Sequence, residues 1–148
     1  KSQTYSQNYN NRNFNLDSYG LLPKISYYLN KDIYFSVFYE YKNKENKEND
    51  FETLISDKIG VAANYAKSEK AQMKAEINLF NNEFSGNSNS PVAFQMLEGL
   101  QSGTNYTWNL SFQKKITSYL DVNFNYLGRK SETSKAIHTG SLQLRASF

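Results

Sequence analysis

The feature of this sequence that most constrains the fold is a regular alternation of apolar and polar residues. Between Leu120 and Tyr126 every second residue is apolar or aromatic, and the residues between them are polar. Successive side chains of a β-strand point to opposite faces of the sheet, whereas a helix would spread the same residues around its axis. The pattern therefore predicts β-strands with one apolar face and one polar face.

The same alternation recurs in seven segments, which we predict to be strands: about 14–29, 33–43, 53–67, 71–83, 104–115, 119–129 and 135–148. The first segment contains Pro23, which has no backbone N–H to donate, so we expect that strand to be irregular or bulged there. Short connections at 30–32, 68–70 and 116–118 alternate with longer polar connections at 42–50, 81–103 and 130–134. Short turns on one side and long loops on the other are typical of outer-membrane barrels.

Composition separates this chain from two other classes of protein. Aromatic residues make up 16% of the chain, including 12 Tyr and 10 Phe, although the mean hydropathy is −0.73. Disordered chains are poor in aromatic residues, and helical membrane proteins need long apolar runs that this sequence lacks. We therefore predict an all-β protein, an antiparallel transmembrane β-barrel with seven or eight strands in this chain. A soluble β-sandwich with an aromatic core is the alternative interpretation.

The alternation also assigns side chains to the two sides of such a barrel, because lipid favours the apolar face and water the polar face. The residues predicted to face lipid are Tyr106, Trp108, Leu110, Phe112, Leu120, Val122, Phe124, Tyr126, Leu142 and Leu144. The residues predicted to line the lumen are Lys74, Glu76, Asn109, Gln113, Asp121, Asn123, Asn125, Gln143 and Arg145. Positive and negative charges nearly balance in the second set, which predicts either a polar plug or a passage with little ion selectivity.

The longest connection, 81–103, changes character partway along its length. Its first half is polar, and its second half contains four apolar residues: Val92, Phe94, Met96 and Leu97. A disordered loop would have no need of these side chains. We predict that they fold onto the rim or into the lumen, with a helical turn, or contact a partner.

The strand number raises the question of how the barrel closes. A complete bacterial barrel has an even number of strands and both termini at the periplasm, whereas seven strands place the start of the first one outside the cell. Either residues 1–10 contain a poor eighth strand, or the chain is the C-terminal part of a larger barrel, which is the interpretation that we favour. Residues 1–13 are therefore assigned to an N-terminal extracellular or linker segment, and residues 14–148 to the barrel strands.

Residues for catalysis are few. The chain has no cysteine and a single histidine, His138, and it contains no nucleotide-binding or protease motif. A lipid hydrolase that pairs His138 with Thr139 or Ser141 is one alternative. A net charge of +3 is too small to indicate a nucleic-acid partner. We predict that the chain is not an enzyme and that it holds neither a cofactor nor a metal ion.

Charged residues concentrate in the connection after the second predicted strand. The cluster consists of the carboxylates of Glu45, Glu48, Asp50 and Glu52 together with Lys42, Lys44 and Lys47. Such a cluster could bind calcium or lipopolysaccharide, but the spacing of a calcium-binding loop is absent. We predict a solvated loop of mixed charge.

The segment from Phe94 to Phe148 resembles the C-termini of large outer-membrane β-barrel proteins of Bacteroidota, among them the translocon of the type 9 secretion system. The resemblance lies in FQMLEGLQSGTNYTW, YLGRKSE and IHTGSLQLRASF and covers a little over a third of the chain. It implies closing strands of an outer-membrane barrel that forms or closes a transport or secretion pore, or anchors a surface complex. A small self-contained eight-stranded barrel with surface-binding loops is the alternative.

The terminal aromatic residue, Phe148, resembles the insertion signal that the barrel assembly machinery reads, with Leu142 and Leu144 on the same face of the strand. The partners that the resemblance implies are outer-membrane lipid and lipopolysaccharide, the assembly machinery, and other strands or chains of a larger complex.

Overall fold

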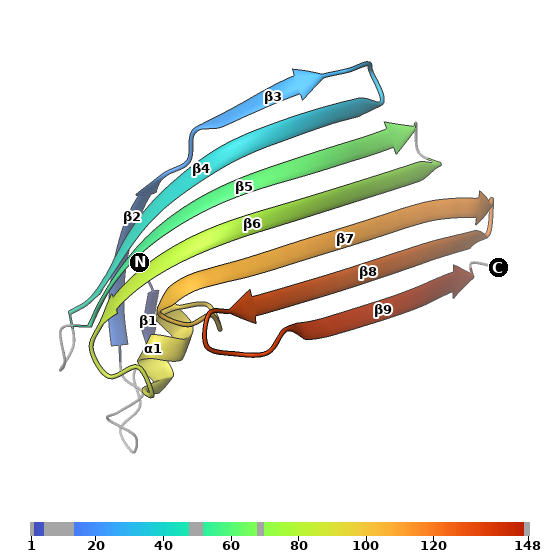
Figure 1. Ribbon diagram of the computed structural model, residues 1–148. Coiled ribbons are helices and arrows are strands. Elements are labelled where there is room, and N and C mark those ends of the chain that lie inside the picture. The colour runs from blue at the N-terminus through green and yellow to red at the C-terminus, as the bar shows by residue number, and fades with distance from the viewer. Residues whose placement is uncertain (1, 5–13, 48–51, 68–69, 147–148) are drawn as a thin grey trace. The chain divides into compact units, whose positions relative to one another are not determined.

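The chain is an all-β protein in the computed structural model, which describes residues 2–4, 14–47, 52–67 and 70–146. The strands are β1 (Ser2–Thr4), β2 (Phe14–Leu21), β3 (Lys24–Tyr28), β4 (Ile33–Asn46), β5 (Thr53–Lys67), β6 (Ala71–Ser85), β7 (Gly103–Thr117), β8 (Leu120–Ser131) and β9 (Ile137–Ala146). A short helix, α1 (Pro91–Met96), lies between β6 and β7 in the sequence (Figure 1). All seven predicted segments contain strands, so the predicted all-β class is confirmed.

The strands form one antiparallel sheet. Its order is β1-β2-β4-β5-β6-β7-β8-β9, and β3 also pairs with β4. Apart from β2 and β3, which both pair with β4, strands that follow one another in the chain are neighbours in the sheet, which is the meander that short connections favour. Among the described residues this path is open, with β1 at one end and β9 at the other. No helix in the described part of the chain has the length and apolar character needed to span a membrane.

Contacts divide the chain into two compact units. The first unit comprises Lys1–Pro23, Tyr39–Lys58 and Phe80–Asn105. The second unit comprises Lys24–Phe38, Ile59–Leu79 and Tyr106–Phe148.

Pro23 interrupts the first long strand without shifting its register. Leu21 stands opposite Tyr41 and Lys24 stands opposite Phe38, so the same number of residues separates the two pairs on each strand. The Pro23 carbonyl still accepts a hydrogen bond of 3.1 Å from the backbone N–H of Tyr39. Proline thus removes one donor and interrupts the strand at Leu22 and Pro23, but it inserts no extra residue. The predicted irregularity is confirmed, and the predicted bulge is wrong because no extra residue is inserted.

The apolar core of the first unit lies where the loop after β6 folds back on the sheet. It consists of Leu16, Leu54, Val92, Met96 and Leu97, with Phe14 and Phe84 packed against it. Ser90 starts α1, because its Oγ accepts a hydrogen bond of 2.9 Å from the backbone N–H of Ala93. Pro91 follows at the first helical position, where its missing N–H leaves no hydrogen bond unmade.

Candidate functional site

The sheet of the second unit has two faces, and side-chain contacts identify the residues of one of them. A Cβ at Gly60 would lie 2.1 Å from the Phe38 ring and 2.5 Å from the Asn78 side chain, so these three residues of β4, β5 and β6 share a face. Asn78 Nδ2 donates a hydrogen bond of 3.1 Å to Thr107 Oγ1, which extends that face to β7. We call it the polar face.

Trp108 marks the opposite face of the same unit. A Cβ at Gly128 would lie 1.9 Å from the Trp108 ring, and the ring centroids of Trp108 and His138 are 5.5 Å apart. Because side chains alternate along a strand, these contacts place Trp108, Gly128 and His138 of β7, β8 and β9 on one face. We call it the apolar face.

The register between β8 and β9 keeps the apolar side chains on one face and the polar side chains on the other. Phe124 stands opposite Leu142 on the apolar face, and Asp121 stands opposite Arg145 on the polar face. Residues directly opposite one another in an antiparallel pair are close enough to interact, and opposite charges there are favourable. A register shifted by one residue would bring apolar and polar side chains together.

The structure gathers each predicted set of residues on one face. On the apolar face lie Tyr106, Trp108, Leu110, Phe112, Leu120, Val122, Phe124, Tyr126, Leu142 and Leu144. On the polar face lie Lys74, Glu76, Asn109, Gln113, Asp121, Asn123, Asn125, Gln143 and Arg145. A cavity of about 340 Å³ on the second unit has Lys74, Gln113, Asn123 and Asn125 among its lining residues.

In the second unit, large apolar side chains on the apolar face are exposed, while two polar side chains on the polar face are buried. Leu142 is 67% exposed, whereas Ser36 and Asn78 on the other face are 2% and 6% exposed. The exposed apolar residues of the apolar face include Ile25, Tyr27, Phe35, Val37, Ile59, Val61, Ile77, Leu79, Tyr106 and Leu144. Soluble proteins rarely expose a continuous apolar surface of this kind, which usually marks contact with a membrane or another protein.

The single histidine belongs to the apolar face. His138 Nδ1 is 2.7 Å from the Tyr126 hydroxyl, and the two rings are stacked with centroids 6.0 Å apart. Thr139 and Ser141 alternate with His138 along β9 and therefore point to the polar face. The imidazole and these two hydroxyls point away from each other. Nowhere in the described residues are three or more His, Cys, Asp or Glu side chains grouped to hold a metal ion.

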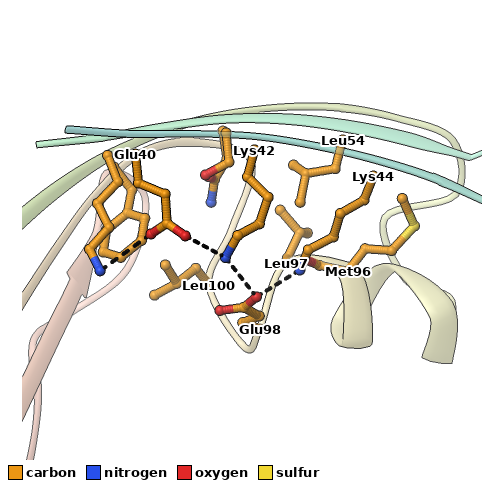
Figure 2. Close-up of a pocket in the computed structure, with 12 residues that line it drawn as sticks. Glu40, Lys42, Lys44, Leu54, Met96, Leu97, Glu98 and Leu100 are labelled. Carbon is orange, nitrogen blue, oxygen red and sulfur yellow. Dashed lines mark hydrogen bonds and ion pairs between the residues drawn. The ribbon is translucent and has the colours of Figure 1, made fainter. Parts of the chain in front are cut away.

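In the first unit, Lys44 fastens the loop after β6 to the sheet (Figure 2). Its Nζ donates hydrogen bonds of 2.7 Å to the Met96 carbonyl and to Glu98 Oε1, and its side chain is only 12% exposed. Glu98 has a φ of 55°, a left-handed conformation that costs a residue other than glycine roughly 1–2 kcal/mol. The contacts with Lys44 hold the Glu98 carboxylate at this strained corner.

The Lys44–Glu98 pair belongs to a row of alternating charges. Lys42 Nζ lies 3.5 Å from Glu98 and 3.2 Å from Glu40, and Lys58 Nζ lies 3.6 Å from Glu40. Partial burial raises the pKa of Glu98, but the hydrogen bonds and charges of Lys44 and Lys42 outweigh it and bring that pKa below its ordinary value. The cavity beneath the loop is about 20 Å³, room for little more than one water molecule.

A buried carboxylate holds the start of α1. Glu52 is 1% exposed, and its Oε1 accepts a hydrogen bond of 2.7 Å from Ser90 Oγ, while its Oε2 accepts one of 3.2 Å from Asn46 Nδ2. The predicted solvated loop of mixed charge is therefore wrong for Glu52, which is buried, and for Lys44, which is partly buried, because both contact the loop after β6. Glu48 and Asp50 lie outside the described residues.

The apolar residues of the loop divide into two groups. Val92, Met96 and Leu97 are buried against the sheet, at 4%, 0% and 6% exposed. Phe94 is 68% exposed, so the prediction that it packs onto the rim or into the lumen is wrong. It lies on the side of α1 that faces away from Val92, Ala93 and Met96. Contact of Phe94 with a partner stays a prediction.

Two predictions concern the ends of the chain. Ser2–Thr4, within the predicted N-terminal segment 1–13, pairs antiparallel with Phe14–Leu16. The predicted insertion signal, Phe148, lies outside the described residues.

Comparison with known proteins places the chain in no family: no family model matches it, and no curated protein or solved structure is significantly similar.

Proposed function

We propose that this chain forms part of a transmembrane β-barrel of the bacterial outer membrane, in which it helps to form or close a transport or secretion pore or to anchor a surface complex. The observation that carries the proposal is the exposed apolar face of the second unit, opposite a face on which the polar side chains of Ser36 and Asn78 are buried. Each Å² of such apolar surface costs about 25 cal/mol in water. In hydrocarbon the same surface is favourable, and paired strands satisfy the backbone.

The character of β4 along its length supports a membrane boundary. Its residues on one face change from Phe35 and Val37 to Tyr39 and Tyr41, and then to Asn43. The Tyr39 hydroxyl donates a hydrogen bond to Asp57, and Asn43 Nδ2 donates one of 3.1 Å to the hydroxyl of a neighbouring tyrosine. Tyrosine rings with polar tips are typical of the level at which lipid headgroups begin. Lipopolysaccharide is then the partner that we propose beyond this level.

The loop after β6, which Lys44 holds to the sheet, supports the proposal that the lumen of the barrel is narrowed. Lys44 lies on the face of β4 that this loop covers, and we propose that this face of the first unit lines the lumen. The loop thus covers the lumen side of the first unit. Lipid, the barrel assembly machinery, and further strands or chains are the other partners that we propose.

The only tryptophan of the chain tests the proposal, because Trp108 lies on the apolar face. The chain is diluted from urea into lipid vesicles or into lipid-free buffer. We expect β-structure and blue-shifted Trp108 emission only with vesicles, and quenching of that emission by lipids with brominated acyl chains. A folded, monomeric chain in lipid-free buffer would contradict the proposal.

A matched variant moves the probe to the other face. In the double variant Trp108→Phe, Gln113→Trp, the single tryptophan lies on the polar face, where Gln113 is exposed and lines the larger cavity. We expect its emission to be quenched by aqueous iodide and not by brominated lipid. Equal quenching of both proteins by brominated lipid would mean that the two faces do not meet different solvents.

A second candidate is the self-contained eight-stranded barrel, which the pairing of β1 with β2 favours. β1 has three residues, whereas β9 has ten. Migration on a gel separates the candidates: a barrel closed within the chain shifts between unheated and heated samples, and a sheet with an open edge does not.

A further inference from the structure

The two edges of the sheet differ in their ability to accept another strand. β9 is ten residues long, all of its residues are exposed, it contains no proline, and in the described part of the chain it pairs only with β8. The opposite edge is interrupted at Pro23, and β1 already covers the start of β2. A long, uninterrupted edge presents a row of unpaired N–H and C=O groups, which is a template for a further strand.

The direction of β9 excludes one simple partner. Six antiparallel steps lead from β2–β3 through the sheet to β9, so β9 and β2–β3 run in the same direction. These two edges cannot form an antiparallel pair with each other. β1 runs in the required direction, but it covers only three residues of its neighbour.

We propose that the free edge of β9 binds one further β-strand, which runs antiparallel to β9 and comes from polypeptide outside residues 1–148. Its residues beside Leu142 and Leu144 are apolar, and its residues beside Ser141 and Gln143 are polar, because the partner strand continues both faces of the sheet. Its residue beside Arg145 is uncharged and hydrogen-bonding, since Asp121 already stands opposite that guanidinium.

A second copy of the chain fits this edge less well. If β9 paired with β9 of another copy, the β2–β3 edge of each copy would stay unpaired. Two β2–β3 edges could not pair with each other in the same way, because β1 already covers the start of β2. Open sheet edges do not persist in hydrocarbon. This step, and the apolar side of the partner strand, rest on the proposed function; the docking itself depends only on the exposed edge.

A synthetic strand tests the proposal. The probe is a peptide with the sequence of residues 120–129 and the substitution Asn123→Cys, because β8 is an antiparallel partner that the other edge of β9 already accepts. The full chain in detergent micelles carries Gln143→Cys, near the end of β9, or Thr139→Cys, near its start. The chain has no cysteine of its own, so each disulfide is unambiguous.

Antiparallel docking predicts a disulfide between the peptide and the Gln143→Cys chain. It predicts no disulfide between the peptide and the Thr139→Cys chain. A peptide of the same composition in scrambled order should form no disulfide with either chain. Preferential linkage to Thr139→Cys would indicate a parallel partner and overturn the proposal. So would peptide-free dimers of Gln143→Cys, or a chain that gains neither a cross-link nor β-structure with the peptide.

The outcome is separable from that of the proposed function, because quenching of Trp108 by brominated lipid requires no peptide. A chain that inserts into vesicles but ignores the peptide would refute only the inference about β9.

Discussion

The indole of Trp108 lies against the backbone of Gly128, where a Cβ would come within 1.9 Å of the ring. Gly128→Ala therefore forces the indole out of place, and we expect it to lower the free energy of unfolding by about 1–3 kcal/mol, as overpacking usually does. Urea unfolding monitored by circular dichroism measures the change. Gly140→Ala is the matched control, because no atom lies within 4 Å of a Cβ at that position of the same face. Equal destabilisation by both substitutions would argue against the contact.

The apolar face predicts a strong asymmetry between adjacent residues of β9. Leu142→Arg places a charge on the face that we propose to meet lipid, and such a charge costs about 2–4 kcal/mol at the centre of a bilayer and less near its surfaces. Gln143→Arg places the same charge on the polar face and should insert normally. Unfolding in vesicles compares the two. Because Leu142 is 67% exposed, a protein in water would tolerate Leu142→Arg as easily as Gln143→Arg.

Lys44 should be the residue that holds the loop to the sheet. Lys44→Met keeps much of the side-chain volume but leaves the carbonyl of the buried Met96 without the Lys44 donor, which costs about 1–3 kcal/mol for a buried group. The exposed Glu98 carboxylate loses its closer cation and keeps its contact with Lys42. We expect faster hydrogen exchange at the backbone N–H groups of Phe94 and Leu97. Lys47→Met removes a similar cation from an exposed pair with Asp17 and should leave that exchange unchanged.

The lowered pKa of Glu98 predicts the pH dependence of the same contact. The unfolded chain binds a proton to Glu98 at a higher pH than the folded chain does, so stability rises with pH between the lowered pKa and the ordinary value of 4.5. The contribution is complete above 4.5 and is lost as the pH falls through the lowered pKa. Urea unfolding of the wild type and of Glu98→Gln should differ at neutral pH and converge in acid. A constant difference would contradict this assignment.

Ser90 should stabilise α1 through two hydrogen bonds. Ser90→Ala removes both the acceptor for the N–H of Ala93 and the donor to Glu52, and we expect a loss of about 1 kcal/mol from the cap alone. Ser90→Thr retains the hydroxyl and should recover most of this loss. Ser88→Ala, at an exposed position of the same loop, is the control. Chemical denaturation measures all three.

The strands and their two faces could be predicted from the sequence, because the alternation of apolar and polar residues is a local pattern. The alternation of Phe124 with Asn123 and Asn125 identifies a strand and both of its faces, and Pro23 marks the one strand that breaks. The two possible outcomes at Pro23, a bulge or a simple interruption, could not be separated. That choice depends on the partner strand, where the Tyr39 N–H still finds the Pro23 carbonyl.

Contacts between distant segments could not be predicted. Lys44 and Glu98 are 54 residues apart, and no local pattern distinguishes Lys44 from a nearby exposed lysine such as Lys47. The apolar residues in the second half of the loop did predict packing. The helix has only six residues, so their spacing in the sequence could not predict that Phe94 points outward. The contact of Trp108 with Gly128 likewise depends on the register between two strands, which becomes visible only in the sheet.

The separation of 54 residues between Lys44 and Glu98 also has a consequence for the order in which the molecule assembles. Each hairpin closes a short stretch of chain, as β8 and β9 do, and short closures are the fastest steps of folding. The loop, in contrast, needs a surface that β4 and β5 create only after they have paired. Its docking is thus a late event, and the nascent sheet passes through a stage in which the face of β4 and β5 that the loop covers is still bare.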